Sequence, residues 1–201
     1  MKHTVLIPLG LSALLLTSAC AQKVSGLAAF IDACTPATAT GPEIRADMTA
    51  AGWNPQAPSD APQELRDLIG AHMHALRPGN SVAQQTEAIN EFVPAFRASL
   101  NDPDRGQMYT RDGAVAVVFS QGEDLSCLWA GLDDADFAAQ TADLGPFPPL
   151  DDVFTTSSVT FKDELSENGR DWVRNTKYSR VTPETQIGPF AVSARLDRSP
   201  Q

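Results

Sequence analysis

The spacing of the apolar residues changes near residue 100, and this change limits the folds that the chain can adopt. In the first half, apolar residues recur three and four positions apart, as on one face of a helix, beginning with Leu27, Phe30, Ile31 and Cys34. In the second half they alternate with polar residues or form short runs, which is typical of strands. Helices, three strands, a helix and three strands follow one another. This order predicts an α+β fold, with N-terminal helices (within residues 24–100) packed on a C-terminal antiparallel sheet.

Two of the predicted helices have clear start signals. Asp60 followed by Gln63, and Ser81 followed by Gln84, resemble the capping box, in which each side chain bonds the other residue's backbone N–H group. Pro94 falls inside the last apolar run of the helical half. Because proline removes a helix hydrogen bond, we expect this last helix to be kinked or split.

The predicted sheet lies within residues 107–197, and its strands are bounded by turns. Asp133 or Asp134 is expected to begin the short helix between the two groups of strands, and Gly145 to end it. The proline-rich stretch at residues 54–62 is expected to be a surface connection. The predicted strands cover residues 107–111, 114–120, 125–131, 153–162, 171–181 and 190–197.

Two of the three cysteines are expected to form a disulfide. Cys20 lies in a predicted signal peptide, so Cys34 and Cys127 remain as an even pair. In an oxidising compartment they would close a loop of roughly 95 residues and stabilise the fold by on the order of 4 kcal/mol. Two separate buried thiols are the alternative. Because the bridge would join the first helix to a central strand, we expect residues 22–201 to form a single domain.

Residues 1–21 have the three regions of a secretory signal peptide. A positive start at Met-Lys-His is followed by an apolar run from Thr4 to Leu16 and by small residues up to Ala21. The apolar run is shorter than the stretch of about 20 residues that spans a bilayer. We therefore expect export to the periplasm of a bacterium.

Two cleavage sites are open. Leu-Thr-Ser-Ala-Cys, ending at Cys20, resembles the lipobox of bacterial lipoproteins, although Thr17 stands where that motif usually has Leu. The resemblance implies a lipid on Cys20, and Ala21 after it resembles the pattern that directs lipoproteins to an outer membrane. Alternatively, Ala19-Cys20-Ala21 is an ordinary signal peptidase site and the mature chain starts at Gln22. We expect membrane contact only through this possible lipid anchor.

The chain is acidic, with 25 Asp and Glu against 15 Lys and Arg and a formal net charge of −10. Because the phosphates of a nucleic acid would be repelled, we do not expect a nucleic-acid partner. Nine acidic residues and no Lys or Arg lie in residues 112–161. Such a surface would attract cations, but we favour the interpretation that the excess acid maintains solubility.

His72 and His74 are the histidines beyond the signal peptide. On a strand they would share a face and could bind a metal, whereas on a helix they point about 200° apart. The surrounding spacing is helical, which predicts a packed or half-buried His72 and a solvent-facing His74. We therefore expect neither a metal site nor another cofactor.

One predicted strand carries a candidate interaction surface. Trp172, Arg174, Tyr178 and Arg180 alternate along a single face of it. Tryptophan, tyrosine and arginine are enriched at interface hot spots, so this face would suit a partner if it were exposed. In the alternative interpretation the aromatic side chains cover the sheet and the arginine stems extend towards solvent.

No catalytic motif is recognised: the chain has no GxSxG, SxxK, HExxH, P-loop or GxGxxG sequence. We therefore expect a non-catalytic binding or accessory module of the cell envelope, whose partner is an envelope protein or a small ligand. A small periplasmic hydrolase is one alternative, because residues far apart in sequence can assemble an active site. A metal-binding envelope protein that uses His72, His74 and acidic groups is another.

Overall fold

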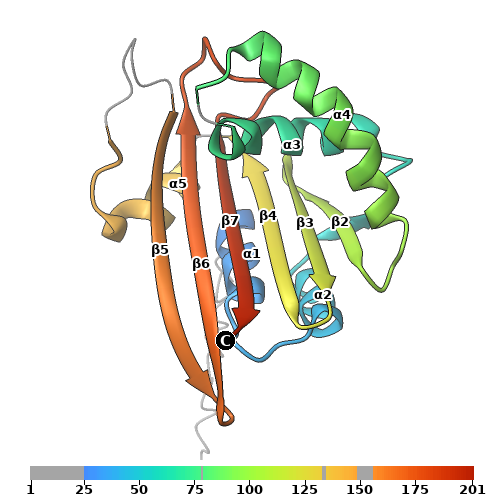
Figure 1. Cartoon of the computed structure of the whole chain (residues 1–201), viewed down its shortest axis with the longest axis vertical. Helices are drawn as coiled ribbons and strands as arrows, with labels where there is room; N and C mark the ends of the chain where they lie inside the picture. The colour runs from blue at the N-terminus through green and yellow to red at the C-terminus, as the bar shows by residue number, and fades with distance from the viewer. Residues whose placement is uncertain (1–24, 78, 133–134, 149–155) are drawn as a thin grey trace, which may run out of the picture.

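An antiparallel sheet with helices on both faces forms the protein in the computed structural model, which describes residues 25–77, 79–132, 135–148 and 156–201 (Figure 1). The order of its seven strands is β1-β2-β3-β4-β7-β6-β5. The strands are β1 (Asn54–Gln56), β2 (Gly106–Arg111), β3 (Ala114–Gln121), β4 (Asp124–Gly131), β5 (Thr156–Glu167), β6 (Arg170–Val181) and β7 (Val192–Pro200). The helices are α1 (Gly26–Cys34), α2 (Gly41–Ala50), α3 (Pro62–Leu76), α4 (Val82–Leu100) and α5 (Ala135–Thr141), which a 3-10 turn (Ala142–Leu144) follows. The predicted α+β fold is confirmed.

The two faces of the sheet carry separate apolar clusters. In Figure 1, α3 and α4 lie on the side towards the viewer, while α1, α2 and α5 lie behind the strands. Strand alternation divides the side chains between these faces, so that Leu128 and Arg195 point to one face and Cys127 and Leu196 to the other. One cluster includes Phe30, Trp53, Trp129 and Phe137, and the other includes Leu65, Leu68, Ile89 and Val117.

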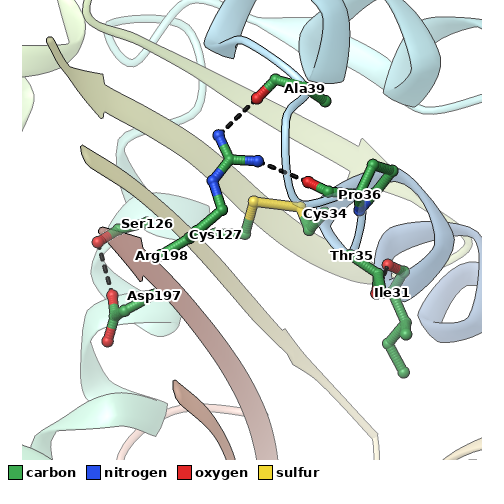
Figure 2. The surroundings of a disulfide bond; sticks show 9 residues. All are labelled: Ile31, Cys34, Thr35, Pro36, Ala39, Ser126, Cys127, Asp197 and Arg198. Atoms are coloured by element: carbon green, nitrogen blue, oxygen red, sulfur yellow. Dashed lines mark hydrogen bonds between the residues drawn. A yellow bond between two sulfur atoms is a disulfide. The ribbon is translucent and has the colours of Figure 1, made fainter. Parts of the chain in front are cut away.

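Cys34 and Cys127 form the predicted disulfide, with their Cα atoms 6.4 Å apart. The bond joins the last residue of α1 to β4, 93 positions later in the chain (Figure 2). Arg198 of β7 holds the segment that follows α1, because its guanidinium donates to the carbonyl oxygens of Pro36 and Ala39. Two contacts distant in sequence therefore fix the end of α1 against the sheet.

Of the two predicted capping boxes, one is confirmed and one is wrong. Ser81 accepts a hydrogen bond from the Gln84 backbone N–H, and the Gln84 side chain accepts one from the Ser81 N–H. By contrast, α3 begins after Ala61, which has no side-chain cap, and the Gln63 amide donates to Asp67 instead. Proline is favoured at the first position of a helix, because the N–H group that it lacks would have no partner there and its φ angle is already helical. Pro62 therefore sets the start of α3, two residues after Asp60.

Pro94 does not split α4, which runs without a break from Val82 to Leu100. Pro94 lies on the exposed side of the helix. There, water can bond the carbonyl group that proline leaves without a backbone partner, so the lost hydrogen bond costs less than it would in the core.

The predicted strands match the sheet with shifts at their ends. β5 continues to Glu167, beyond the predicted end at residue 162, and β7 covers Val192–Pro200 rather than residues 190–197. Residues 153–155, and the predicted helix start at Asp133 or Asp134, lie outside the described residues. The proline-rich connection contains the short edge strand β1, which the sequence does not predict, because a strand of three residues is too short to show an alternating pattern.

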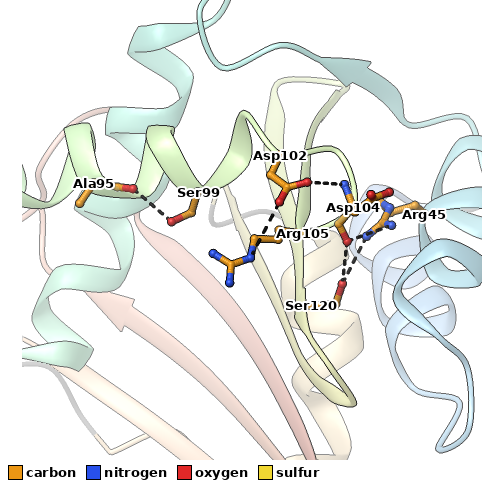
Figure 3. A network of polar contacts seen from close by, with 7 residues as sticks. All are labelled: Arg45, Ala95, Ser99, Asp102, Asp104, Arg105 and Ser120. Carbon is orange, nitrogen blue, oxygen red and sulfur yellow. Dashed lines mark hydrogen bonds and ion pairs between the residues drawn. The ribbon is translucent and has the colours of Figure 1, made fainter.

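A polar network fixes the corner where α2, β3 and the turn before β2 meet (Figure 3). Arg45 lies 3.4 Å from the Ser120 hydroxyl and 3.5 Å from the backbone oxygen of Asp104. Glycine at position 41 lets the start of α2 lie close to β3, since a Cβ atom there would lie 2.4 Å from Ser120 Oγ.

Within the described ranges, no helix combines the length and hydropathy that a membrane span requires.

Candidate functional site

A groove of about 280 Å³ opens between α3, α4 and the sheet face beneath them. Its helical walls are Leu68, Ile69, His72, Met73 and Leu76 of α3 with Phe92 and Phe96 of α4. Its floor is formed by Phe119, Ser126, Leu128 and Arg195, from the neighbouring strands β3, β4 and β7.

The rim of the groove exposes large apolar side chains to solvent. Leu76 is 48% exposed and Phe92 is 43% exposed. They are two of four large apolar residues that are exposed in the described part of the chain, the others being Val82 and Leu132. An exposed apolar patch in a concave place is typical of a binding surface, because it costs free energy in water and gains it on contact.

The apolar residues of α4 cover more of the helix surface than the part that packs in the core. Ile89, Val93 and Leu100 face the core and are buried. Phe92 and Phe96 lie beside them on the helix and border the groove. All five residues belong to one apolar run in the sequence, and this run does not distinguish the residues that line the groove from those in the core.

The groove ends at a polar cluster on the sheet. The Ser126 hydroxyl donates to Asp197 over 2.6 Å, and Arg195 Nε lies 2.7 Å from the other Asp197 oxygen. Lys177 of β6 lies directly opposite Arg195 of β7, so both point to the same face. Its ammonium group donates to the backbone oxygen of Ala75, next to Leu76 on the rim.

His72 lies at the base of the groove and is neutral. Its Nε2–H donates to the backbone oxygen of Trp129 over 3.2 Å. Burial lowers the pKa of His72 to about 3, and the positive charges of Arg195 and Lys177 act in the same direction. The prediction of a packed His72 is confirmed.

The prediction of a solvent-facing His74 is wrong, because the side chain is only 5% exposed. His74 Nε2 donates to the backbone oxygen of Thr185 over 2.6 Å, and Nδ1 accepts from the buried Gln85 amide over 2.9 Å. His72 and His74 do point to different sides of α3, as helix periodicity predicts. However, α4 and the β6–β7 connection cover the side on which His74 lies. Burial lowers the pKa of His74 as well.

No group of three or more potential metal ligands occurs among the residues that the structure describes. Both ring nitrogens of His74 are bonded within the protein, and one nitrogen of His72 is. The two imidazoles therefore act as separate hydrogen-bonding groups on α3.

Trp172, Arg174, Tyr178 and Arg180 share one face of β6, as the alternation indicates, but this face is covered. Trp172 is 5% exposed and Tyr178 is 6% exposed. Arg174 bonds Asp163 on β5 and the backbone oxygen of Thr35, next to the disulfide. These side chains therefore do not form the exposed interaction surface proposed from the sequence.

Arg180 also belongs to this covered face. Its guanidinium lies over the rings of Phe137 in α5 and Phe147, at 5.5 and 5.3 Å from their centres. The contacts stabilise the packing of α5 on the sheet, since a cation is attracted to an aromatic face. The alternative interpretation is confirmed for the aromatic side chains, which cover the sheet, but it is wrong for the arginines, because Arg174 bonds Thr35 and Asp163 and Arg180 lies over two phenylalanine rings.

The groove contains two residue types that hydrolases use, Ser126 and His72, and each of them bonds another partner. Ser126 donates to Asp197, and the described contacts of His72 include Trp129 rather than Ser126. A serine nucleophile needs a base within about 2.6–3.2 Å of its hydroxyl, and a histidine with a pKa near 3 is a poor base at neutral pH. What the groove offers is an apolar surface with one polar end.

This site could not be predicted from the sequence, because its residues come from five elements, α3, α4, β3, β4 and β7. Phe119, Leu128 and Arg195 meet only because β4 pairs with both β3 and β7.

Comparisons with protein-family models, curated proteins and solved structures find no match to this chain.

Proposed function

We propose that the protein is an exported binding protein of the bacterial cell envelope, and that its groove between α3, α4 and the sheet takes up a small apolar or amphipathic molecule. The observation that carries the proposal is the groove of about 280 Å³ with the exposed side chains of Leu76 and Phe92 on its rim. Ligand sites are typically concave and mostly apolar, with a few polar groups that orient the ligand.

Two features support export. Residues 1–21 have the composition of a secretory signal peptide, and the Cys34–Cys127 disulfide is compatible with an oxidising compartment. In this proposal the protein resides in the periplasm, with an outer-membrane anchor if Cys20 is lipidated.

Mass spectrometry of the mature protein tests the export. We expect a chain that begins with acylated Cys20 or with Gln22, and whose mass rises by two hydrogen atoms when the Cys34–Cys127 disulfide is reduced. A purified protein that retains Met1 and has free thiols before reduction would overturn this part of the proposal.

The binding role is favoured over catalysis because the polar groups of the groove already bond one another. Asp197 is shared between Ser126 and Arg195, and His72 is held by Trp129. Substrate turnover would need one of these contacts to be exchanged, whereas binding needs only the apolar surface.

An uncharged apolar dye tests the binding role. Phenylnaphthylamine fluoresces more strongly in apolar surroundings, so we expect saturable enhancement with the native protein. The double variant L76A/F92A removes the exposed rim and should weaken binding by about tenfold or more, since partial burial of each side chain contributes on the order of 1 kcal/mol.

The matched control is L132A, which removes the same kind of side chain at 56% exposure outside the groove. It should leave dye affinity unchanged. The proposal fails if the dye does not bind, or if L132A and L76A/F92A weaken it equally.

A further inference from the structure

Two positive side chains lie side by side at the polar end of the groove. Lys177 and Arg195 are direct partners in the antiparallel pairing of β6 and β7, and both are only partly exposed. Like charges directly opposite each other in a sheet repel, and the local apolar surroundings strengthen that repulsion. Burial lowers the pKa of Lys177, and the charge of Arg195 contributes.

The negative charge near this pair does not balance it. Asp197 lies 2.7 Å from Arg195 Nε and also accepts from Ser126. In the described part of the chain, the hydrogen bond of Lys177 goes to the carbonyl of Ala75, and no carboxylate lies within ion-pair distance of it. The cluster therefore carries one net positive charge, on a protein whose formal net charge is −10.

The positive pair adjoins the apolar surface. Arg195 forms part of the groove floor, and the ammonium group of Lys177 reaches the residue before Leu76. A molecule that contacts Leu128 and Phe119 along the floor can thus place one end beside Arg195 and Lys177. The groove volume lies near the lower end of the range of about 300–1,000 Å³ for ligand pockets, which favours a short chain.

We propose that the groove binds a medium-chain fatty acid, with the acyl chain against the phenylalanines of α4 and β3 and the carboxylate between Lys177 and Arg195. This inference rests on the proposed binding function and names its ligand class. A carboxylate neutralises the net charge of the cluster and accepts charge-assisted hydrogen bonds from both side chains. Asp197 lies at the Nε side of Arg195, so the Nη groups are the ones that would reach the ligand.

Titration calorimetry with decanoate and decanol tests the proposal. The two ligands share the same chain and differ in the head group, so their difference in affinity isolates the carboxylate. We expect the native protein to bind decanoate at least tenfold more tightly than decanol. K177M keeps the apolar stem of the lysine, and it should abolish this preference while leaving decanol binding unchanged.

The matched control is K162M, which removes an exposed lysine of β5 that pairs with Glu164 and does not line the groove. It should preserve the preference for decanoate. Retained decanol binding by K177M also shows that the variant is folded and its groove intact.

The outcomes separate the two proposals. Equal affinity of the native protein for decanoate and decanol would overturn the fatty-acid inference while the binding function stands. A preference for decanoate that persists in K177M, or that K162M abolishes as well, would also overturn it. Failure of both ligands to bind would overturn the inference together with the groove as a binding site.

Discussion

His72 and His74 lie on different sides of α3, yet both are buried and bonded within the protein. Each folded pKa is below the ordinary value, because burial disfavours the charged imidazolium. The unfolded chain therefore binds protons that the folded protein does not, so acid favours unfolding.

We predict that the stability of the protein falls as the pH decreases below about 6.5, the ordinary pKa of histidine. The contribution of His72 is fully present above this pH and is lost progressively towards its folded pKa of about 3. The slope for one proton is about 1.4 kcal/mol per pH unit at most. Urea unfolding at pH 7 and pH 5 measures it.

H72Q is the informative variant, because its amide can donate to the Trp129 carbonyl but does not titrate. The decrease in the free energy of unfolding between pH 7 and pH 5 should be smaller in H72Q than in the native protein. Because the carboxylates are common to both proteins, their contributions cancel in this comparison. An identical decrease in both would contradict the assignment.

At the scale of elements, capping shows which sequence signals the fold uses. Ser81 caps α4 through a reciprocal pair of hydrogen bonds, whereas the similar pattern at Asp60 leads into a helix that begins with Pro62. Both patterns have a polar residue followed by Gln three positions later. Proline at the first helical position distinguishes them, since its fixed φ angle already favours helix entry there.

We predict that S81A destabilises the protein by about 1 kcal/mol, because it leaves the first N–H groups of α4 without a side-chain acceptor. D60A should change stability by less than about 0.5 kcal/mol, since Asp60 is exposed and caps no helix. Urea unfolding of the two variants at pH 7 compares them directly. Equal losses would mean that Asp60 does cap α3.

At the scale of the whole molecule, the disulfide and Arg198 hold the N-terminal helices to the sheet. The disulfide joins α1 to β4, and Arg198 of β7 bonds the segment directly after it. A long loop closed by a disulfide lowers the entropy of the unfolded chain more than a short one does. Because the disulfide and Arg198 connect the N-terminal helices to the sheet, we expect the helices and the sheet to unfold together as one cooperative unit.

We predict that C34A/C127A lowers the free energy of unfolding by on the order of 4 kcal/mol. Reduction of the native protein should cause a similar loss, which separates the effect of the cross-link from that of changed packing. Urea unfolding followed by far-ultraviolet circular dichroism and by tryptophan fluorescence makes the measurement. The oxidised protein should give coincident transitions, as a single domain does, whereas two separate transitions would contradict it.

Local signals account for most of what could be predicted. The apolar spacing of Leu27, Phe30, Ile31 and Cys34 places them on one side of a helix wherever that helix lies. The alternation around Val192, Ala194 and Leu196 likewise indicates a strand. These patterns depend on neighbours within a few positions, and so the predicted order of helices and strands agrees with the structure except for the short strand β1 between α2 and α3. The cysteine count and the signal peptide, read together, were enough to predict the disulfide.

The candidate site depends on contacts that have no local signal. His74 is buried because the distant β6–β7 connection covers it, and Phe92 is exposed although it continues an apolar face. The fatty-acid proposal depends on Lys177 lying opposite Arg195.

Apart from the short strand β1, the sequence by itself therefore determined the element types, their order and the covalent bond between two of them. The tertiary structure decided the strand order, the register and which apolar side chains remain uncovered. The physical reason is the distance along the sequence over which each interaction acts. Hydrogen bonds and side-chain spacing within a helix or a turn involve residues only a few positions apart. Strand partners and helix positions, by contrast, are selected by packing between segments that approach each other only when the whole chain folds.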